Sequence, residues 1–221
     1  MGRSYSTVIF DLDGTLLDTS EGILASVSYT IEKEGLPRLS EAEMLSFIGP
    51  PSQESFRRIY DLDESRALEL ATIFRNRYKE PPDLIKAKPY EGIFELCASL
   101  KSTGCRLAVA TYKREDYART LLCHFGFDKY FDFMYGSDFE NKLKKLDIIE
   151  KCLVDCEVSD RAEAVMIGDS HHDALGAKSV GVDFLGVTYG FGFREAADVE
   201  EFPNVGWAAR PLELLPLILK K

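Results

Sequence analysis

The hydrophobic positions of this 221-residue chain follow two different periods. Short, mostly apolar runs predict buried strands, because a strand inside a parallel sheet is covered on both faces. From residue 89 onward, apolar residues that recur every three or four residues predict helices between these runs. Strands that alternate with helices predict an α/β fold, a doubly wound parallel (Rossmann-like) sheet. The predicted strands are residues 7–10, 107–110, 131–134, 164–167 and 184–187.

A long block after residue 18 shows only the helical period. Ser40 and Glu43 have the spacing of a capping box, which predicts a helix start. The two prolines at residues 81–82 are expected to end the last helix of the block. Because the block interrupts an α/β pattern, we interpret it as an inserted all-helical cap domain. The expected domains are a catalytic core, residues 1–18 and 89–221, and the cap, residues 19–88.

The composition excludes some classes of partner. Acidic residues outnumber basic ones by 37 to 27, a formal net charge of −10, which argues against a nucleic-acid polymer or an anionic membrane as the main partner. No apolar run has the length of a membrane span, and no signal peptide is expected. Five scattered cysteines, an odd number, are expected to be buried, reduced thiols. We therefore expect a cytoplasmic protein, a monomer or homodimer.

Two acidic residues follow the first predicted strand. Asp11 and Asp13 stand at its carboxyl end, and Gly14 lets the backbone turn away. Buried carboxylates are costly to desolvate unless a positive charge compensates them, and a hard divalent cation with oxygen ligands is a natural candidate. An isolated Asp-Leu-Asp turn is more often simply solvated. Further polar residues at other strand ends favour the metal.

The fourth predicted strand also ends in acidic residues. Asp169 is placed like a further metal ligand, and Asp173, four residues on, is placed to orient a bound water, with Ser170 between them. The alternative is that Asp169 and Ser170 only cap the following helix. The carboxyl ends of parallel strands meet at one edge of the sheet, which is where active sites of such folds lie.

A threonine and a lysine complete the candidate set. Thr111 ends the second predicted strand, where its hydroxyl and neighbouring amides can bind a phosphate. Lys142, Lys144 and Lys145 precede a predicted helix, and one of them can neutralise charge around a nucleophile. Most strand-end threonines and most lysine clusters have no such role, so the order of the motifs carries the argument.

Taken in order, D-x-D-G-T-L, a strand-end Thr, a Lys and G-D-x-x-x-D, this sequence resembles the haloacid dehalogenase superfamily, over essentially the whole chain. Within it the chain is most similar to the phosphoglycolate phosphatase group with a helical (C1-type) cap, and to its 5′-nucleotidase-like members. The resemblance implies a phosphatase that uses Mg²⁺, with Asp11 as nucleophile and Asp13 as general acid and base. It implies Asp11, Asp13 and Asp169 as metal ligands and Thr111 as a phosphate-binding residue. Asp173 and Ser170 are then expected to contact the ligands and not the metal itself.

The sequence departs from the family pattern at two motifs. No Lys-Pro dipeptide follows Lys113, and the helix register makes Lys145 the best match for the active-site lysine, with Lys142 or Lys144 as alternatives. A bulky Tyr112 follows Thr111, where the family usually has a small residue, and is expected to narrow the entrance. Substrate contacts are expected from Asp11, Leu12, Asp13, Thr111, Tyr112, Lys145, Gly49 and Pro50. A sugar phosphomutase and, more distantly, a phospho-accepting receiver domain remain as alternative functions.

The cap is expected to choose the substrate. Between residues 20 and 88 twelve acidic residues face ten basic ones, so the cap is no basic funnel for polyanions. Phe47, Phe56 and Arg57 lie near Gly49-Pro50 in sequence and suit a flat base or a sugar. The alternative is that both phenylalanines belong to the cap interior. We expect a small-molecule phosphomonoester, with 5′-nucleoside monophosphates ahead of phosphoglycolate.

Overall fold

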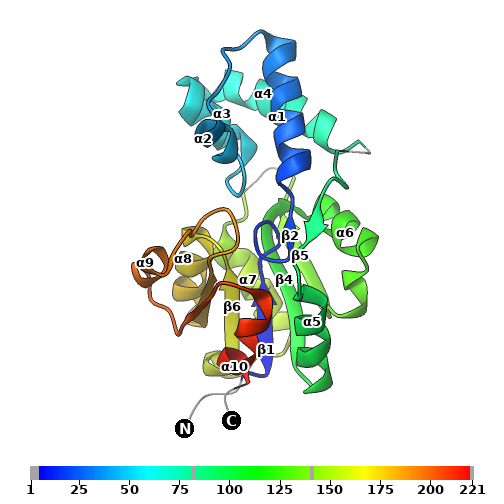
Figure 1. The fold of residues 1–221 in the computed structure, drawn as a ribbon, viewed down its shortest axis with the longest axis vertical. Helices are drawn as coiled ribbons and strands as arrows, with labels where there is room; N and C mark the ends of the chain where they lie inside the picture. Colours follow the sequence, from blue (N-terminus) through cyan, green and yellow to red (C-terminus); the bar gives the residue numbers. More distant parts are fainter. Residues whose placement is uncertain (1–4, 81–82, 140–141, 220–221) are drawn as a thin grey trace. The chain divides into compact units, whose positions relative to one another are not determined.

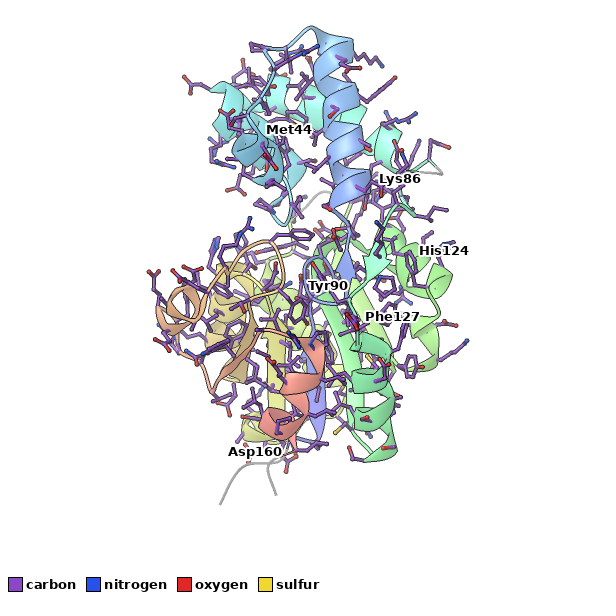
Figure 2. The ribbon with its side chains drawn as sticks, in the orientation of Figure 1. Met44, Lys86, Tyr90, His124, Phe127 and Asp160 are labelled. Carbon is purple, nitrogen blue, oxygen red and sulfur yellow. The ribbon has the colours of Figure 1, made fainter. Side chains whose placement is uncertain are left out.

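The computed structural model describes residues 5–80, 83–139 and 142–219. It divides into two compact units (Figure 1). The core unit comprises Met1–Leu17 and Pro89–Lys221, and the helical unit comprises Asp18–Lys88. In Figure 2, Tyr90 and Phe127 mark the core unit and Met44 marks the helical unit.

The core unit is built on a six-stranded parallel sheet in the order β5-β4-β1-β6-β7-β8. The first strand lies between β4 and β6, and Ile9 is in register with Ala108 on one side and with Met166 on the other. This arrangement confirms the predicted doubly wound parallel sheet. The strands are β1 (Thr7–Phe10), β4 (Arg106–Arg114), β5 (Phe133–Ser137), β6 (Ala164–Gly168), β7 (Asp183–Val187) and β8 (Trp207–Ala208).

Side chains alternate between the two faces of a strand, and every residue of β1 and β6 is buried, so both faces of these two strands are covered. Ile9, Ala108 and Met166 share one interior cluster with residues of α7 and α8. Phe10, the next residue along β1, instead packs edge-on against Phe131, with 5.8 Å between ring centroids. The helices of this unit are α5 (Ile93–Ser102), α6 (Glu115–His124), α7 (Lys145–Asp155), α8 (His171–Val180), α9 (Ala196–Glu200) and α10 (Leu215–Ile218), with 3-10 turns η1 (Phe127–Lys129), η2 (Arg161–Glu163) and η3 (Pro211–Leu214).

The strands differ from prediction at two places. The third strand was expected at residues 131–134 but begins two residues later, because the Asp132 carboxylate accepts a hydrogen bond from the Leu107 backbone N–H at 2.9 Å. The second strand continues to Arg114, and its register against β5 shifts between Ala110 and Arg114. This irregularity lies at the predicted phosphate-binding motif. The short strands β2 (Leu17–Asp18), β3 (Lys88–Pro89) and β8 carry too few residues for a period to show.

The helical unit contains α1 (Ser20–Glu34), α2 (Glu41–Leu45), α3 (Ser52–Tyr60) and α4 (Glu64–Tyr78). The capping box at Ser40 and Glu43 is confirmed, since each side chain binds the other residue's backbone N–H. The prolines at 81–82 lie outside the described residues. Phe47 and Phe56 are buried against each other, with 4.8 Å between ring centroids. They form part of this unit's interior, so the hypothesis that they stack on a substrate base is wrong.

Two expectations from composition can be compared with the structure. Across the described ranges, no helix combines the length and the apolarity that crossing a bilayer requires. All five cysteines are free thiols, and four of them are buried. Cys123 is exposed on α6, so the expectation of five buried thiols is wrong at that position.

Candidate active site

The site begins where β1 ends. Asp11 follows the last strand residue, and its backbone N–H donates to the Ile167 carbonyl at 2.9 Å, which fixes it beside β6. Its carboxylate is buried, and Oδ1 lies 2.6 Å from Nζ of Lys145. Lys145 is the first residue of α7, and its side chain is only 4% exposed, whereas Lys142 and Lys144 are exposed. Of the three candidate lysines, the structure therefore brings Lys145 to the predicted nucleophile.

A second carboxylate shares the Lys145 ammonium. Oδ1 of Asp173, in the first turn of α8, lies 2.7 Å from Nζ of Lys145. The other oxygen, Oδ2, accepts hydrogen bonds from Ser170 Oγ at 2.6 Å and from the Ser170 backbone N–H at 3.1 Å. Ser170 and Asp173 thus form a capping box at the start of α8, and this box holds Asp173 with one oxygen on Lys145.

Asp169 lies in a cradle of backbone that sequence reasoning missed. Its Oδ2 accepts hydrogen bonds from the backbone N–H groups of Phe191 at 2.7 Å and Gly192 at 3.1 Å. A Cβ on Gly190 would lie 2.4 Å from this oxygen, and a Cβ on Gly14 only 2.1 Å. Glycine is therefore required at both positions for the backbone to approach the carboxylate. The signal in the sequence was the pair of glycines around Phe191.

The acidic cluster carries more negative charge than Lys145 neutralises. Burial raises the pKa of Asp11 to about 8, against the lowering effect of Lys145 and with the further raising effect of Asp173, Asp169 and Asp13. Burial and Asp173 raise the pKa of Asp169 to about 7, although its backbone hydrogen bonds act in the opposite sense. Burial alone would lower the pKa of Lys145, but Asp11 and Asp173 hold it above its usual range, so the lysine stays charged.

Asp13 has a different partner, which the sequence did not suggest. Its Oδ1 lies 3.0 Å from Nζ of Lys113, and the two side chains are 10% and 6% exposed. The predicted phosphate ligand Thr111 is buried near this pair, and its Oγ1 accepts a hydrogen bond from the Lys113 backbone N–H at 3.1 Å. Lys113 stands two residues after Thr111, and that spacing along a strand was the available signal.

The remaining predicted substrate contacts are distributed over both units. The Tyr112 hydroxyl accepts a hydrogen bond from the Lys145 backbone N–H at 3.1 Å, and its ring meets His172 edge-on, so it braces α7 against α8. The Leu12 side chain is buried, and its carbonyl accepts hydrogen bonds from the turn that follows. Gly49 and Pro50 lie between α2 and α3 in the helical unit, where their contact with substrate stays a prediction.

Comparison with known proteins agrees with this geometry. Residues 8–187 match the haloacid dehalogenase-like hydrolase family. The chain belongs to that family. A 5′-nucleotidase of Pseudomonas aeruginosa is 38% identical over 188 residues, which are 85% of either chain. The pyrophosphatase PpaX of Halalkalibacterium halodurans is 35% identical over 83% of this chain and 84% of its own. A solved structure described as a predicted phosphatase from Clostridium acetobutylicum superposes with a TM-score of 0.88 at 34% identity, covering 99% of this chain and 100% of the other.

These findings confirm the predicted resemblance and the assignment of the chain as an enzyme of the phosphatase type. They also speak against the receiver-domain alternative, because that class has no helical insertion and this hydrolase has a complete helical unit between β1 and β4. The relatives differ in the substrates that their names state. Membership of the family therefore indicates that the substrate carries a phosphoryl group, but it does not identify the leaving group.

The acidic cluster of this haloacid dehalogenase-like hydrolase fits a divalent cation. Carboxylate oxygens of Asp11, Asp169 and Asp173 lie within 4.8 Å of one another, all three buried. Oxygen-only donors suit Mg²⁺, and a bound cation would favour the ionised forms of Asp11 and Asp169, whose pKa values are raised by burial and by neighbouring carboxylates. The Asp13 carboxylate is not a member of this cluster and pairs with Lys113 instead.

Proposed function

We propose that this enzyme hydrolyses small organic phosphate monoesters through a phosphoryl group carried on Asp11. The observation that carries the proposal is the position of the Asp11 carboxylate. It is buried at the carboxyl end of the central strand, 2.6 Å from a buried ammonium, within an acidic cluster that fits a cation. A carboxylate nucleophile splits a difficult hydrolysis into two easier steps.

In the first step an Asp11 oxygen attacks phosphorus, and the bond from phosphorus to the ester oxygen breaks. Asp13 gives a proton to the leaving oxygen in this step. In the second step Asp13 takes a proton from the water that attacks the aspartyl-phosphate, and Asp11 and inorganic phosphate are released. Lys145 faces Asp11 throughout and stabilises the charge on the transferring group, while Thr111 and the backbone around Leu12 and Tyr112 bind its oxygens.

We propose that Mg²⁺ is held by Asp11 and Asp169, with Asp173 as the third carboxylate of the cluster and Ser170 orienting it. When bound, the ion supplies positive charge to the phosphoryl oxygens. The assignment of Asp13 as a further ligand stays a prediction, and its carboxylate is engaged by Lys113. The cradle formed by Phe191 and Gly192 fixes one oxygen of Asp169, which leaves the other for the ion.

For the substrate we propose a 5′-nucleoside monophosphate ahead of phosphoglycolate, selected by the helical unit acting as the cap. The support is the name of the 38% identical relative, a 5′-nucleotidase, and the near balance of charge in the cap sequence. Phe47 and Phe56 give no support for a flat base, because both rings are buried. The exposed Arg57 remains a candidate for contact with the leaving group.

The test is a hydrolysis screen over phosphorylated metabolites with added Mg²⁺, in which kcat/KM is compared between nucleoside monophosphates and phosphoglycolate. We expect Mg²⁺-dependent release of phosphate and a higher kcat/KM for the nucleotides. A tenfold preference for phosphoglycolate, about 1.4 kcal/mol of discrimination, would overturn the order of substrates and leave the phosphatase in place. Transfer of the phosphoryl group to another hydroxyl of the sugar, with no free phosphate, would identify a mutase.

A further inference from the structure

The ion pair between Lys113 and Asp13 takes no part in the two proposed chemical steps. Nζ and Oδ1 are 3.0 Å apart, and both side chains are at least nine-tenths covered. Removing two charges from water can cost more free energy than their mutual attraction returns. A buried ion pair is therefore weak evidence for a role in stability alone. A buried cation that meets the predicted general acid therefore suggests a role in the chemistry.

The backbone holds Lys113 in place from two sides. Within β4 the register against β5 shifts between Ala110 and Arg114, and irregularities of this kind re-aim side chains beside active sites. The Lys113 N–H is tied to Thr111 Oγ1 at 3.1 Å. On β5, a Cβ at Gly136 would lie 2.4 Å from the Lys113 carbonyl oxygen, so only glycine lets the two strands approach this closely.

The two buried lysines form ion pairs with different carboxylates. Lys145 faces Asp11 and Asp173, at 2.6 and 2.7 Å, and Lys113 faces Asp13. Loss of the Lys113 ammonium would remove the ion pair that helps to fix Oδ1 of Asp13. Proton transfer needs the donor oxygen within hydrogen-bond reach of the leaving oxygen, and a displacement of about 1 Å can cost about 10²-fold in rate.

We propose that Lys113 is a positioning residue that holds the carboxyl group of Asp13 for proton transfer to the leaving group. The proposal rests on the proposed function. As the bond from phosphorus to the ester oxygen breaks, the electron pair goes to that oxygen, which takes the proton of Asp13 and leaves as an alcohol. Asp13 is then a carboxylate, still beside the Lys113 ammonium. A lysine that bound the phosphoryl oxygens directly would assist every substrate equally.

The test compares two leaving groups in Lys113→Met. An alkyl phosphate such as glycerol 2-phosphate needs a proton on its leaving oxygen, whereas p-nitrophenyl phosphate leaves as a stable anion. The parameter is kcat/KM, which reports the steps up to formation of the aspartyl-phosphate. We expect kcat/KM to fall about 10²-fold for the alkyl phosphate and less than tenfold for p-nitrophenyl phosphate, since a general acid contributes about 10²–10⁴. Lys113→Arg, which keeps the cation, should restore most of the loss.

The controls separate this role from folding and from the proposed function. Lys178→Met, an exposed lysine of α8, should change neither rate. In an Asp13→Asn background, Lys113→Met should cause no further loss with the alkyl phosphate. If Lys113→Met does not fold, Lys113→Gln takes its place in the same comparison. Equal losses for both substrates, with Asp11→Asn inactive, would overturn the role of Lys113 alone. Activity retained in Asp11→Asn would instead overturn the proposed function.

Discussion

Removal of the Lys145 charge is the perturbation that tests the geometry of the site most severely. Lys145→Met keeps most of the apolar stem and deletes the ammonium that lies 2.6 Å from Asp11 and 2.7 Å from Asp173. Three buried carboxylates, those two and Asp169, then remain within 4.8 Å of one another without their cation. Removing one partner of a buried ion pair costs about 3–5 kcal/mol, because the remaining charge is left uncompensated.

The pH dependence of that cost follows from the direction of the pKa shifts. Burial raises the pKa of Asp11 from 3.8 to about 8 in the folded protein, so its ionisation opposes folding as the pH rises from about 4 to about 8. Loss of Lys145 removes the one contribution that lowers this pKa, and the opposition grows. We therefore expect the destabilisation to be near 3–5 kcal/mol at pH 8. It should be smaller at pH 5, where Asp11 (pKa about 8) and Asp169 (pKa about 7) are protonated.

The assay is urea unfolding of the metal-free enzyme at both pH values, with kcat/KM measured separately in Mg²⁺. We expect kcat/KM to fall by about 10²–10³ or more, the effect of losing a preorganised charge at the reacting group. Lys144→Met is the matched control, since Lys144 is the neighbouring residue and is exposed. Lys145→Met within 0.5 kcal/mol of the parent at pH 8, or a larger loss of activity in Lys144→Met, would refute the reasoning.

Three further outcomes are expected. Asp13→Asn should lower kcat by about 10²–10⁴ with an alkyl phosphate, measured at saturating substrate, and an unchanged rate would remove Asp13 as general acid. Mg²⁺ affinity, measured by calorimetry, should rise between pH 5 and pH 8, because protons on Asp11 (pKa about 8) and Asp169 (pKa about 7) compete with the ion. An affinity independent of pH would contradict this site. Gly190→Ala should lower the free energy of unfolding by about 1–3 kcal/mol and weaken Mg²⁺ binding, since its Cβ would lie 2.4 Å from the Asp169 carboxylate. An unaltered Tm and Mg²⁺ affinity would show that the cradle is not needed.

The sheet and the candidate residues at strand ends could be predicted because they rest on strong local patterns. A strand buried on both faces gives an uninterrupted apolar run, so the positions of Asp11 and Asp169 after β1 and β6 follow directly. The start of α7 could be inferred in the same way. Ile149 and Cys152 face inward in the helical period, which places Lys145 in the first turn, where the structure has it.

The features that the sequence did not predict depend on geometry between distant segments. The pair of Lys113 with Asp13 follows a shift of register in β4, and no periodicity predicts such a shift. The backbone cradle of Asp169 comes from a loop about twenty residues later, which only the folded chain brings back to β6. In the helical unit, the sequence positions of Phe47 and Phe56 do not show whether the rings are buried or exposed. Their burial is decided by their packing against each other.

The central claim is that the phosphoryl group passes through Asp11, and direct identification of the labelled residue tests it. The enzyme is mixed with a ³²P-labelled substrate in Mg²⁺, quenched in acid within the first turnover and digested, and the label is located by mass spectrometry. We expect label on Asp11, and neither label nor turnover in Asp11→Asn, whose amide keeps the shape of the side chain but cannot attack phosphorus. Near-normal turnover in Asp11→Asn, or label on another residue, would contradict it.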